Sequence, residues 1–271
     1  MTDPSQGSMG PAAGAERLVD EVPGLLRYAR TLTRDQGQAE DLVQDTVVRA
    51  LERFATFDAR STLATWLHRI MHNLAVDASR RKAELPTDMD DEGIEAVELM
   101  WSNDAYTIDS SVVVERADLR DQLRDALLRL PLTYRSAVVL HDGEGMRMID
   151  VAEIQGIQLP AAKQRLRRGR MMLVSELDSG AAPEPTPEVP LRCWDARSRV
   201  SDYMDDDLAE RDRALLEKHL ETCPTCPPLY AGLVGVREAV GRDRDSDEAV
   251  PTDVAARIRA LIEQSTGLPD R

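Results

Sequence analysis

The sequence predicts an all-α protein built from several modules. Ala, Leu, Arg, Glu and Asp are abundant while aromatic residues make up only 4% of the chain, a composition that favours helices. Apolar residues recur at helical spacing, and no alternating run is long enough for a strand. At 271 residues the chain exceeds the usual size of one domain, so two or three folded modules are expected.

The N-terminal residues and the distribution of charge predict which segments lie outside the folded modules. Residues 1–16 are rich in Gly, Pro, Ala and Ser without a signal-peptide pattern, and no run has the roughly 18 apolar residues of a membrane span. We therefore expect a disordered N-terminus, a cytoplasmic protein and no membrane partner.

The net charge of −15 hides a segregation of acidic and basic residues along the chain. Residues 83–115 carry ten acids and no Lys or Arg, whereas residues 160–170 carry five basic residues and no acid. The acidic part predicts a linker over residues 85–114.

Residues 17–84 predict a first helical module. Apolar residues from Ala39 to Phe54 follow one helix face, and the polar residues Asp41, Gln44, Asp45 and Glu52 fall outside it. A second helix should begin near Ser61 or Thr62, either of which can cap it. Trp66 in this helix is expected in the core.

Residues 115–178 predict a second module that contains a helix-turn-helix. Val151, Ala152 and Ile154 form an apolar face, Gly156 suits the tight turn, and Pro160 suits the first turn of the next helix. The outward face of that second helix carries side chains that can contact phosphates and base edges: Lys163, Gln164, Arg165, Arg167 and Arg168.

Both modules resemble extracytoplasmic-function sigma factors over about 160 residues. Residues 127–173, with Tyr134–Leu140, Val151–Ile154 and Lys163–Leu166, are similar to the promoter-binding domain 4 of that family. Residues 39–45 (AEDLVQD) and 65–70 (TWLHRI) are similar to domain 2. Pro160 and Ala161 depart from the family, which usually has Gly and a hydroxyl residue there.

The resemblance implies roles for particular residues. Core RNA polymerase is the implied partner, bound through its β′ clamp helices and its β flap, together with promoter DNA. The residues expected to face the clamp helices are Asp41, Gln44 and Asp45. Those expected to melt and hold the minus-ten element are Asn73, Asp77, Arg80 and Arg81, whereas domain 4 would bind the minus-35 element. The acidic linker would lie in the polymerase RNA channel or serve as a plain spacer.

A Pro-rich linker over residues 179–190 separates these modules from a cysteine-containing module at residues 191–241. His219, Cys223 and Cys226 form an H-x3-C-x2-C motif, and Cys193 can complete a Cys3His tetrahedron. An odd number of cysteines in a cytoplasmic chain argues against a disulfide framework. The set therefore predicts a structural Zn²⁺ site.

The cysteine module resembles the zinc-binding anti-sigma domains, although Pro227 and Pro228 depart from their pattern. Residues 242–271 should hold a polar stretch and an amphipathic helix over residues 251–264, which would be the further helix with which that family binds its sigma factor. Fusion makes the contact intramolecular, with an effective concentration on the order of millimolar. We expect the module to mask polymerase-facing or DNA-facing surfaces until thiol oxidation, or another metal such as copper, loosens it. The opposite role, a module needed for activity, stays open.

The sequence favours no enzyme, because it has no Gly-rich phosphate loop and no nucleophile–base set. Two alternatives to a transcription initiation factor stay open. One is a sigma-like adaptor or anti-sigma-type protein that sequesters a regulator. The other is an ordinary helix-turn-helix repressor.

Overall fold

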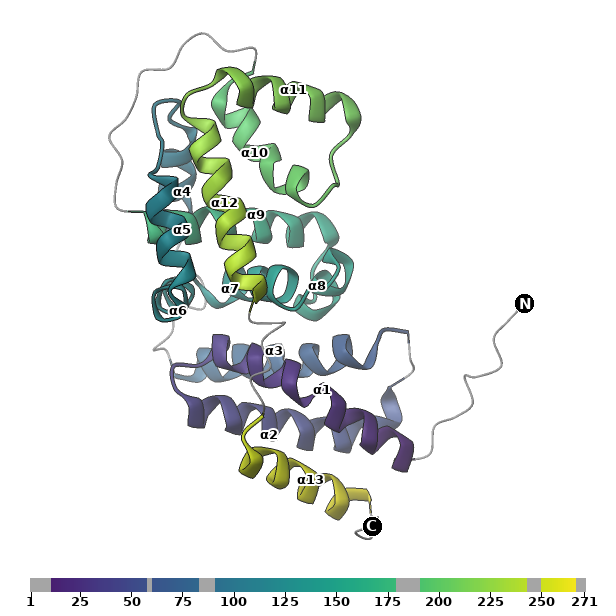
Figure 1. Ribbon diagram of the computed structural model, residues 1–271. Helices are drawn as coiled ribbons and strands as arrows, with labels where there is room; N and C mark the ends of the chain where they lie inside the picture. Colours follow the sequence, from purple (N-terminus) through teal and green to yellow (C-terminus); the bar gives the residue numbers. More distant parts are fainter. Residues whose placement is uncertain (1–10, 58–59, 83–90, 179–190, 243–249, 267–271) are drawn as a thin grey trace, which may run out of the picture.

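The computed structural model describes residues 11–57, 60–82, 91–178, 191–242 and 250–266 (Figure 1). Its described part contains thirteen α-helices and no strand, which confirms the all-α prediction. Residues 1–10 of the expected disordered N-terminus, the expected linker at residues 179–190 and most of the polar stretch after residue 242 lie outside the described residues. Residues 11–16, also expected to be disordered, belong to the first helix, so that part of the prediction is wrong.

The N-terminal lobe consists of α1 (Pro11–Leu32), α2 (Gln36–Arg53) and α3 (Leu63–Lys82), with the short 3₁₀ helix η1 (Phe54–Thr56) between the last two. Asp35 caps α2 by accepting a hydrogen bond from the Gln38 backbone N–H at 2.9 Å. Thr62 caps α3 in the same way, since its hydroxyl accepts from the Thr65 N–H at 3.1 Å. Trp66 is buried beside Phe54 and Phe57, as expected of a core residue.

The helix-turn-helix lobe lies above the N-terminal lobe in Figure 1. Its elements are α5 (Ser110–Asp118), α6 (Arg120–Arg129), α7 (Leu132–Val138), the π-helix η2 (Val139–Gly143), α8 (Met148–Gln155) and α9 (Leu159–Leu177). The buried faces of α7, α8 and α9 pack on one another, and α8 also packs on α3 of the N-terminal lobe.

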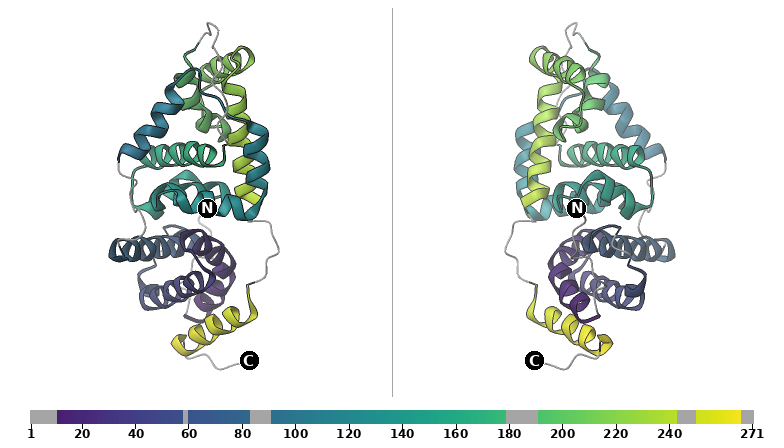
Figure 2. Two further views of the ribbon diagram at one scale, coloured as in Figure 1. Left: turned by 90° about the vertical axis from the view of Figure 1, so that its left-hand side faces the viewer. Right: turned by 90° about the vertical axis from the view of Figure 1, so that its right-hand side faces the viewer.

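The cysteine module consists of α10 (Cys193–Met204), α11 (Glu210–Thr222) and α12 (Cys226–Arg242). Both views in Figure 2 place α10 and α11 at the far end of the molecule from the N-terminal lobe, while α12 runs back across the helix-turn-helix lobe. Two glycines allow α12 to approach α5 closely. A Cβ on Gly232 would lie 2.6 Å from Ile108 Cδ1, and one on Gly235 would lie 2.5 Å from Val114 Cγ2.

Two further helices complete the described part: α4, which was not predicted, and α13, which was. The acidic residues 85–114 were predicted to form a linker, but α4 (Asp91–Ser102) lies within them and packs on α9 and α10. Ile94, Val97 and Trp101 face the core from one side of α4, and burial of this stripe outweighs the acidic composition. The amphipathic helix expected at residues 251–264 is α13 (Thr252–Thr266), which packs on α1 and α2 at the opposite end from the cysteine module (Figure 1).

Candidate DNA-binding surface and metal site

The helix-turn-helix has the geometry that its sequence predicts. Gly156 ends α8 in the left-handed conformation, with φ of 65°. Gly169 of α9 is buried where a Cβ would lie 2.9 Å from the Tyr134 carbonyl oxygen, so the two helices approach at a position that only glycine allows. Pro160 occupies the first turn of α9, where its missing N–H costs no hydrogen bond. The basic side of α9 is thus held on a well-packed scaffold.

An acidic residue of the linker helix binds two of the candidate DNA-binding arginines. Glu98 of α4 accepts hydrogen bonds from Arg168 Nε at 2.9 Å and Arg168 Nη2 at 3.1 Å, and from Arg167 Nη2 at 3.0 Å. The side chains of Glu98, Arg167 and Arg168 are only 24%, 17% and 25% exposed. Trp194 of the cysteine module covers Arg167, whose guanidinium carbon lies 5.5 Å from the centre of its ring. These two guanidinium groups are therefore largely covered by other parts of the chain.

The other three candidate DNA-binding residues on α9 differ in their contacts and exposure. Lys163 forms an ion pair with Asp207 of the cysteine module. Arg165 donates to the side-chain oxygen of Gln155 at 3.0 Å, and Gln164 is exposed. The cysteine module and α4 thus bind Lys163, Arg167 and Arg168, whereas Gln164 stays open to solvent.

A buried ion network joins α9 to the cysteine module. Arg170 is 1% exposed and donates to Asp142 Oδ1 of η2 at 2.6 Å and to Asp205 Oδ1, at the end of α10, at 2.9 Å. His141 lies 3.3 Å from Asp205. Burial lowers the pKa of His141, but the hydrogen bond to Asp205 and the charge of Asp142 outweigh it, so the pKa is raised overall. The network holds α10 on the helix-turn-helix lobe with its charges compensated.

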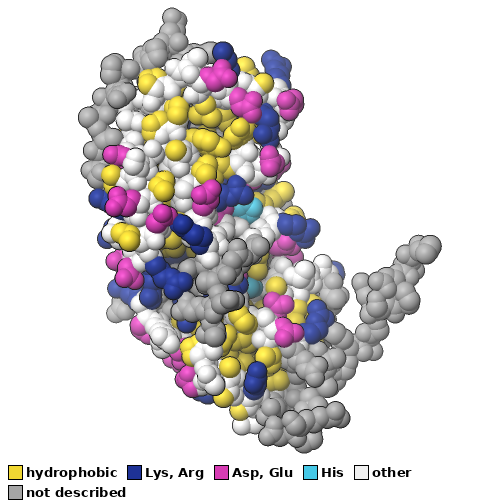
Figure 3. Space-filling view, in the orientation of Figure 1, with side chains coloured by type: hydrophobic (Ala, Val, Ile, Leu, Met, Phe, Trp, Pro, Cys, Tyr) yellow, Lys and Arg dark blue, Asp and Glu magenta, His cyan; other side chains and the backbone are white. Residues whose placement is uncertain are grey.

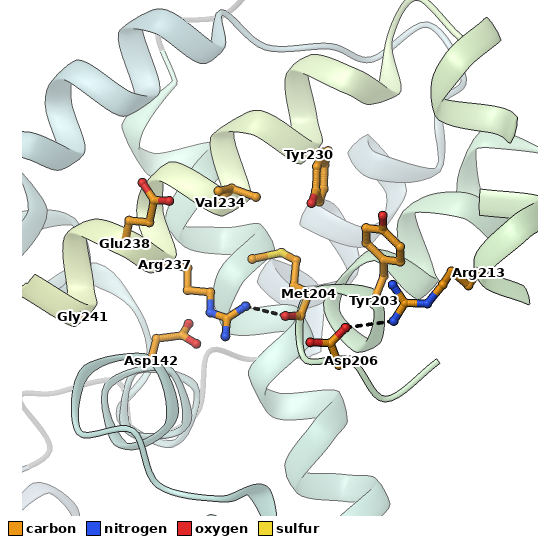
Figure 4. A pocket seen from close by; sticks show the side chains of 10 residues that line it. All are labelled: Asp142, Tyr203, Met204, Asp206, Arg213, Tyr230, Val234, Arg237, Glu238 and Gly241. Carbon is orange, nitrogen blue, oxygen red and sulfur yellow. Dashed lines mark hydrogen bonds and ion pairs between the residues drawn. The ribbon is translucent and has the colours of Figure 1, made fainter. Parts of the chain in front are cut away.

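Beside this network lies a pocket of about 490 Å³ between α10, α12 and η2 (Figure 4). Tyr203 and Tyr230 stand on one side of it and Arg237 on the other, where it donates to the Met204 carbonyl oxygen. Arg213 forms an ion pair with Asp206 at 2.9 Å. The two arginines in the pocket are therefore bound to the end of α10 and the turn after it.

The candidate minus-ten residues face the helix-turn-helix lobe across a groove of about 450 Å³. The groove is lined on one side by Asn73, Asp77 and Arg80 of α3, and on the other by Thr133, Gln155 and Arg165. Arg81 is exposed and donates to the Asp77 carbonyl oxygen at 3.1 Å. The groove therefore brings candidate residues of α3 and α9 together.

Polar contacts hold these two lobes together. In the core of the interface the Tyr28 hydroxyl of α1 hydrogen-bonds Ser136 Oγ of α7 at 2.7 Å and His72 Nδ1 of α3 at 3.2 Å. Burial lowers the pKa of His72 to about 4, so its ring is neutral at pH 7. Near the edge, Arg69 pairs with Glu153 of α8 at 3.2 Å. The two lobes are therefore joined by specific contacts as well as by apolar packing.

Basic side chains also gather where the two lobes meet (Figure 3). A groove of about 500 Å³ there is lined by Arg27, Arg30, Arg120, Arg124 and Arg242, among other residues. Arg27 of α1 pairs with Glu144 at 2.8 Å, and Arg242 of α12 pairs with Asp118. The ion pairs in this groove connect the helix-turn-helix lobe with α1 on one side and α12 on the other.

The candidate polymerase-binding residues lie on α2, with Asp41 and Asp45 exposed and Gln44 half-buried. The neighbouring Glu40 pairs with Arg257 of α13. The C-terminal helix thus reaches this helix, but it leaves the two aspartates open to solvent.

The four candidate metal ligands meet in one buried cluster. Cys193 begins α10, His219 lies in the last turn of α11, Cys223 follows that helix, and Cys226 begins α12. Their ligand atoms all lie within 4.8 Å of one another. Cys193 Sγ is 3.7 Å from Cys223 Sγ, and His219 Nε2 is 3.2 Å from Cys226 Sγ. Pro227 and Pro228 fall in the first turn of α12, where their missing N–H groups cost nothing.

This cluster fits a tetrahedral metal ion. A sulfur–sulfur distance of 3.7 Å is far beyond a disulfide bond of about 2.05 Å, but close to the edge of roughly 3.8 Å of a tetrahedron with Zn–S bonds of about 2.3 Å. Burial raises the pKa values of Cys193 and Cys226, so neighbouring thiolates at these positions need a cation to be stable. Burial also lowers the pKa of His219, which leaves a neutral ring that can act as a ligand. The chemistry is that of a closed structural site.

Sequence reasoning missed the partners of the basic helix. Glu98 was counted only as one acid of a linker, although the spacing of Ile94, Val97 and Trp101 on its helix was a signal for α4. Asp142 and Asp205 gave no signal, because residues so far apart in the sequence meet only through the packing of η2 and α10.

Comparison with known proteins supports the same modules. Three family models match: "Sigma-70 region 2" over residues 18–84, "Sigma-70, region 4" over residues 120–173, and "Putative zinc-finger" over residues 193–226. None of the described helices is long and apolar enough to cross a membrane.

The relatives are named as sigma factors. The chain is 30% identical over 141 residues to the extracytoplasmic-function (ECF) RNA polymerase sigma factor SigW of Bacillus subtilis, covering 52% of this chain and 75% of SigW. It is 30% identical over 176 residues to EcfG of Rhodopseudomonas palustris, covering 65% of this chain and 91% of EcfG. With SigG of Mycobacterium tuberculosis it shares 31% over 181 residues, which is 61% of this chain and about half (49%) of SigG.

A solved structure, the sigma factor RpoE in complex with the anti-sigma factor NepR from Bartonella quintana, is 24% identical with a TM-score of 0.43. The match covers 60% of the present chain and 94% of the matched chain in that structure. The TM-score is too low for this likeness to support the family assignment. The family models and the relatives carry it without that structure. The chain belongs to the ECF sigma factors, which are transcription factors and not enzymes, and it carries a zinc-finger-type module behind its two sigma regions.

Proposed function

We propose that this sigma factor directs core RNA polymerase to promoters, and that the structure is its self-inhibited form. Its site of action is then the cytoplasm, with the β′ clamp helices and the β flap as the polymerase contacts. One observation carries the inhibition: Lys163, Arg167 and Arg168 of α9 are bound by Asp207 and Glu98 of the same chain. Because phosphate contacts need free basic side chains, these ion pairs compete directly with DNA.

The arrangement of the lobes supports the same proposal. The candidate minus-ten residues on α3 and the Arg165 side of α9 line one groove, so the two promoter elements cannot be bound at once without separating the lobes. The exposed Asp41 and Asp45 leave the polymerase-facing part of α2 available for a first contact. We propose that core polymerase and promoter bind after α3 and α9 move apart.

The metal proposed for the module is Zn²⁺, held by Cys193, His219, Cys223 and Cys226. When bound, it supplies a structural crosslink between the start of α10, the end of α11 and the start of α12. Asp205 and Asp207, which bind Arg170 and Lys163, lie at the other end of α10, in the stretch that leads into α11. Loss of the metal, through thiol oxidation or exchange for a metal such as copper, would loosen the module and free α9.

Run-off transcription with purified core polymerase tests the proposal. Full-length protein, residues 1–180 and Asp205→Asn are compared under reducing conditions, with Asp212→Asn on the exposed side of α11 as the matched control. We expect the truncated chain and Asp205→Asn to be more active than the wild type and Asp212→Asn. Equal activity of all four would refute self-inhibition, and lower activity of the truncated chain would show that the module is needed for activity. A chain that never joins core polymerase in any form would be a sigma-like adaptor.

A further inference from the structure

Arg197 of α10 is a buried guanidinium group next to the metal cluster, only 2% exposed. Its Nε donates to Cys226 Sγ at 3.3 Å. Its two terminal nitrogens donate in the opposite direction, to the turn between α4 and α5. The acceptors are the carbonyl oxygens of Trp101 at 2.6 Å, Asn103 at 2.7 Å and Tyr106 at 2.7 Å. One side chain therefore connects a metal ligand with the segment that joins the two sigma regions.

The buried guanidinium of Arg197 needs compensating groups around it. In the part of the chain that the structure describes, no carboxylate lies within ion-pair distance of Arg197. A buried cation is costly without a compensating anion, and carbonyl dipoles supply only part of the compensation. The sulfur of Cys226 is the one atom in contact that carries negative charge when it binds a metal. The hydrogen bond from Nε to that sulfur is then charge-assisted and stronger than one to a neutral thiol.

Thr225 provides a second connection across the same boundary. Its hydroxyl accepts from Arg197 Nη2 at 3.1 Å and donates to the Asp104 carbonyl oxygen at 3.0 Å. In return, the Thr107 hydroxyl donates to the Thr225 carbonyl oxygen at 3.4 Å. Since Thr225 lies between Cys223 and Cys226, the turn rests directly on the loop that carries two metal ligands.

The turn follows directly on α4, the helix that carries the masking residue Glu98. Trp101 lies in the last turn of α4, about one helical turn after Glu98. It is 1% exposed and donates from Nε1 to Ser175 Oγ of α9 at 3.0 Å. If residues 101–106 are held, α4 is held against α9 and Glu98 stays on Arg167 and Arg168. If they are released, α4 loses its C-terminal attachment.

We propose that Arg197 is a positioning residue that couples the metal site to residues 101–107, and through them to the masking of α9 by Glu98. The regulatory meaning of this coupling rests on the proposed self-inhibition, but the coupling itself does not. Because coupling between two sites is reciprocal, the metal stabilises the turn and the turn stabilises the metal site by the same free energy. Arg197 acts on metal affinity as a hydrogen-bonding partner of a ligand, not as a ligand.

The test uses the full chain without polymerase or DNA. Hydrogen exchange of residues 101–107 is followed by mass spectrometry before and after zinc is removed with a chelator, and zinc release to a chromogenic chelator is timed. In the wild type, chelation should raise exchange in residues 101–107 and leave α1 and α2 unchanged. In Arg197→Lys, zinc should leave about tenfold faster, the usual scale for losing a hydrogen-bonding partner of a ligand. Its residues 101–107 should exchange fast from the start, with little further rise on chelation.

Arg199→Lys, on the same helix but contacting Asp195 and Asp212, is the matched control and should behave as the wild type. Thr225→Val is a second probe, used also if Arg197→Lys does not fold by circular dichroism. It should raise exchange in residues 101–107. Three results would overturn the coupling: wild-type zinc release in folded Arg197→Lys, wild-type exchange of residues 101–107 in Thr225→Val, or an unchanged exchange of these residues when the wild type is chelated. Because transcription is not measured, failure here is distinct from failure of self-inhibition.

Discussion

Replacing Glu98 by Gln removes the charge that holds two arginines of α9 and leaves the shape of α4 unchanged. Glu98 forms a bidentate contact with Arg168 and a single contact with Arg167, and all three side chains are about three-quarters buried or more. Charge-assisted hydrogen bonds contribute about 1.5–3 kcal/mol when buried, and exposed pairs about 0.2–1 kcal/mol. We place this partly buried set at about 1–2 kcal/mol, which shifts the balance towards the unmasked form by roughly 5- to 30-fold.

The assay is fluorescence anisotropy with a labelled random-sequence duplex, measured over a range of salt concentrations. Glu98→Gln should bind the duplex more tightly than the wild type by about that factor. The slope of log affinity against log salt concentration should become steeper by about 2, since each of the two freed arginines adds a phosphate contact worth about 0.9. Glu95→Gln, an exposed position on the same helix, is the control. If wild type, Glu98→Gln and Glu95→Gln share one affinity and one salt slope, α4 does not mask the arginines.

Three further predictions concern packing, metal and pH. Gly235→Ala places a methyl group 2.5 Å from Val114 Cγ2 and should destabilise the chain by about 1–3 kcal/mol in denaturant unfolding. Glu238→Ala on the exposed face of α12 should stay within about 0.5 kcal/mol of the wild type, and equal losses would contradict the close-packing argument. Elemental analysis should find one zinc per chain, and both chelation and Cys226→Ala should lower the melting temperature. A metal-free chain with an unchanged melting curve would contradict a structural site. Burial lowers the pKa values of His68 and His72 to about 4, below about 6.5 in the unfolded chain, so their contribution to stability is lost as pH falls from 6.5 towards 4. Each should cost about 2 kcal/mol at pH 5, and His72→Gln should lose less stability than the wild type between pH 7 and pH 5 in denaturant titrations. An identical pH dependence of the two would refute this.

The sequence predicts the helices where local signals are strong. Gly156, Pro160 and the apolar face of α8 carry their own conformational preferences, and the H-x3-C-x2-C motif fixes three ligands on neighbouring helix ends. These features needed no knowledge of distant contacts. The core position of Trp66 followed from helical spacing in the same way.

The masking contacts could not be read from the sequence. A basic helix face predicts DNA binding, but whether Arg167 and Arg168 are free depends on Glu98, which lies 69 and 70 residues away in the chain. Arg170 was part of the same basic run, yet it is buried between Asp142 and Asp205 and serves the contact with the cysteine module. Tertiary packing decides which charges meet, and the composition of either segment alone says nothing about it.

The most direct test of the central claim measures the separation of the two sigma lobes in the free and polymerase-bound chain. Donor and acceptor dyes are placed through non-canonical amino acids at the exposed positions Glu52 and Gln158, so that the three cysteines stay available for metal. The account predicts a single short distance in the free, zinc-loaded chain and a longer one when core polymerase is bound. A free chain whose lobes are already separated, or an unchanged distance in a complex that supports run-off transcription, would contradict it.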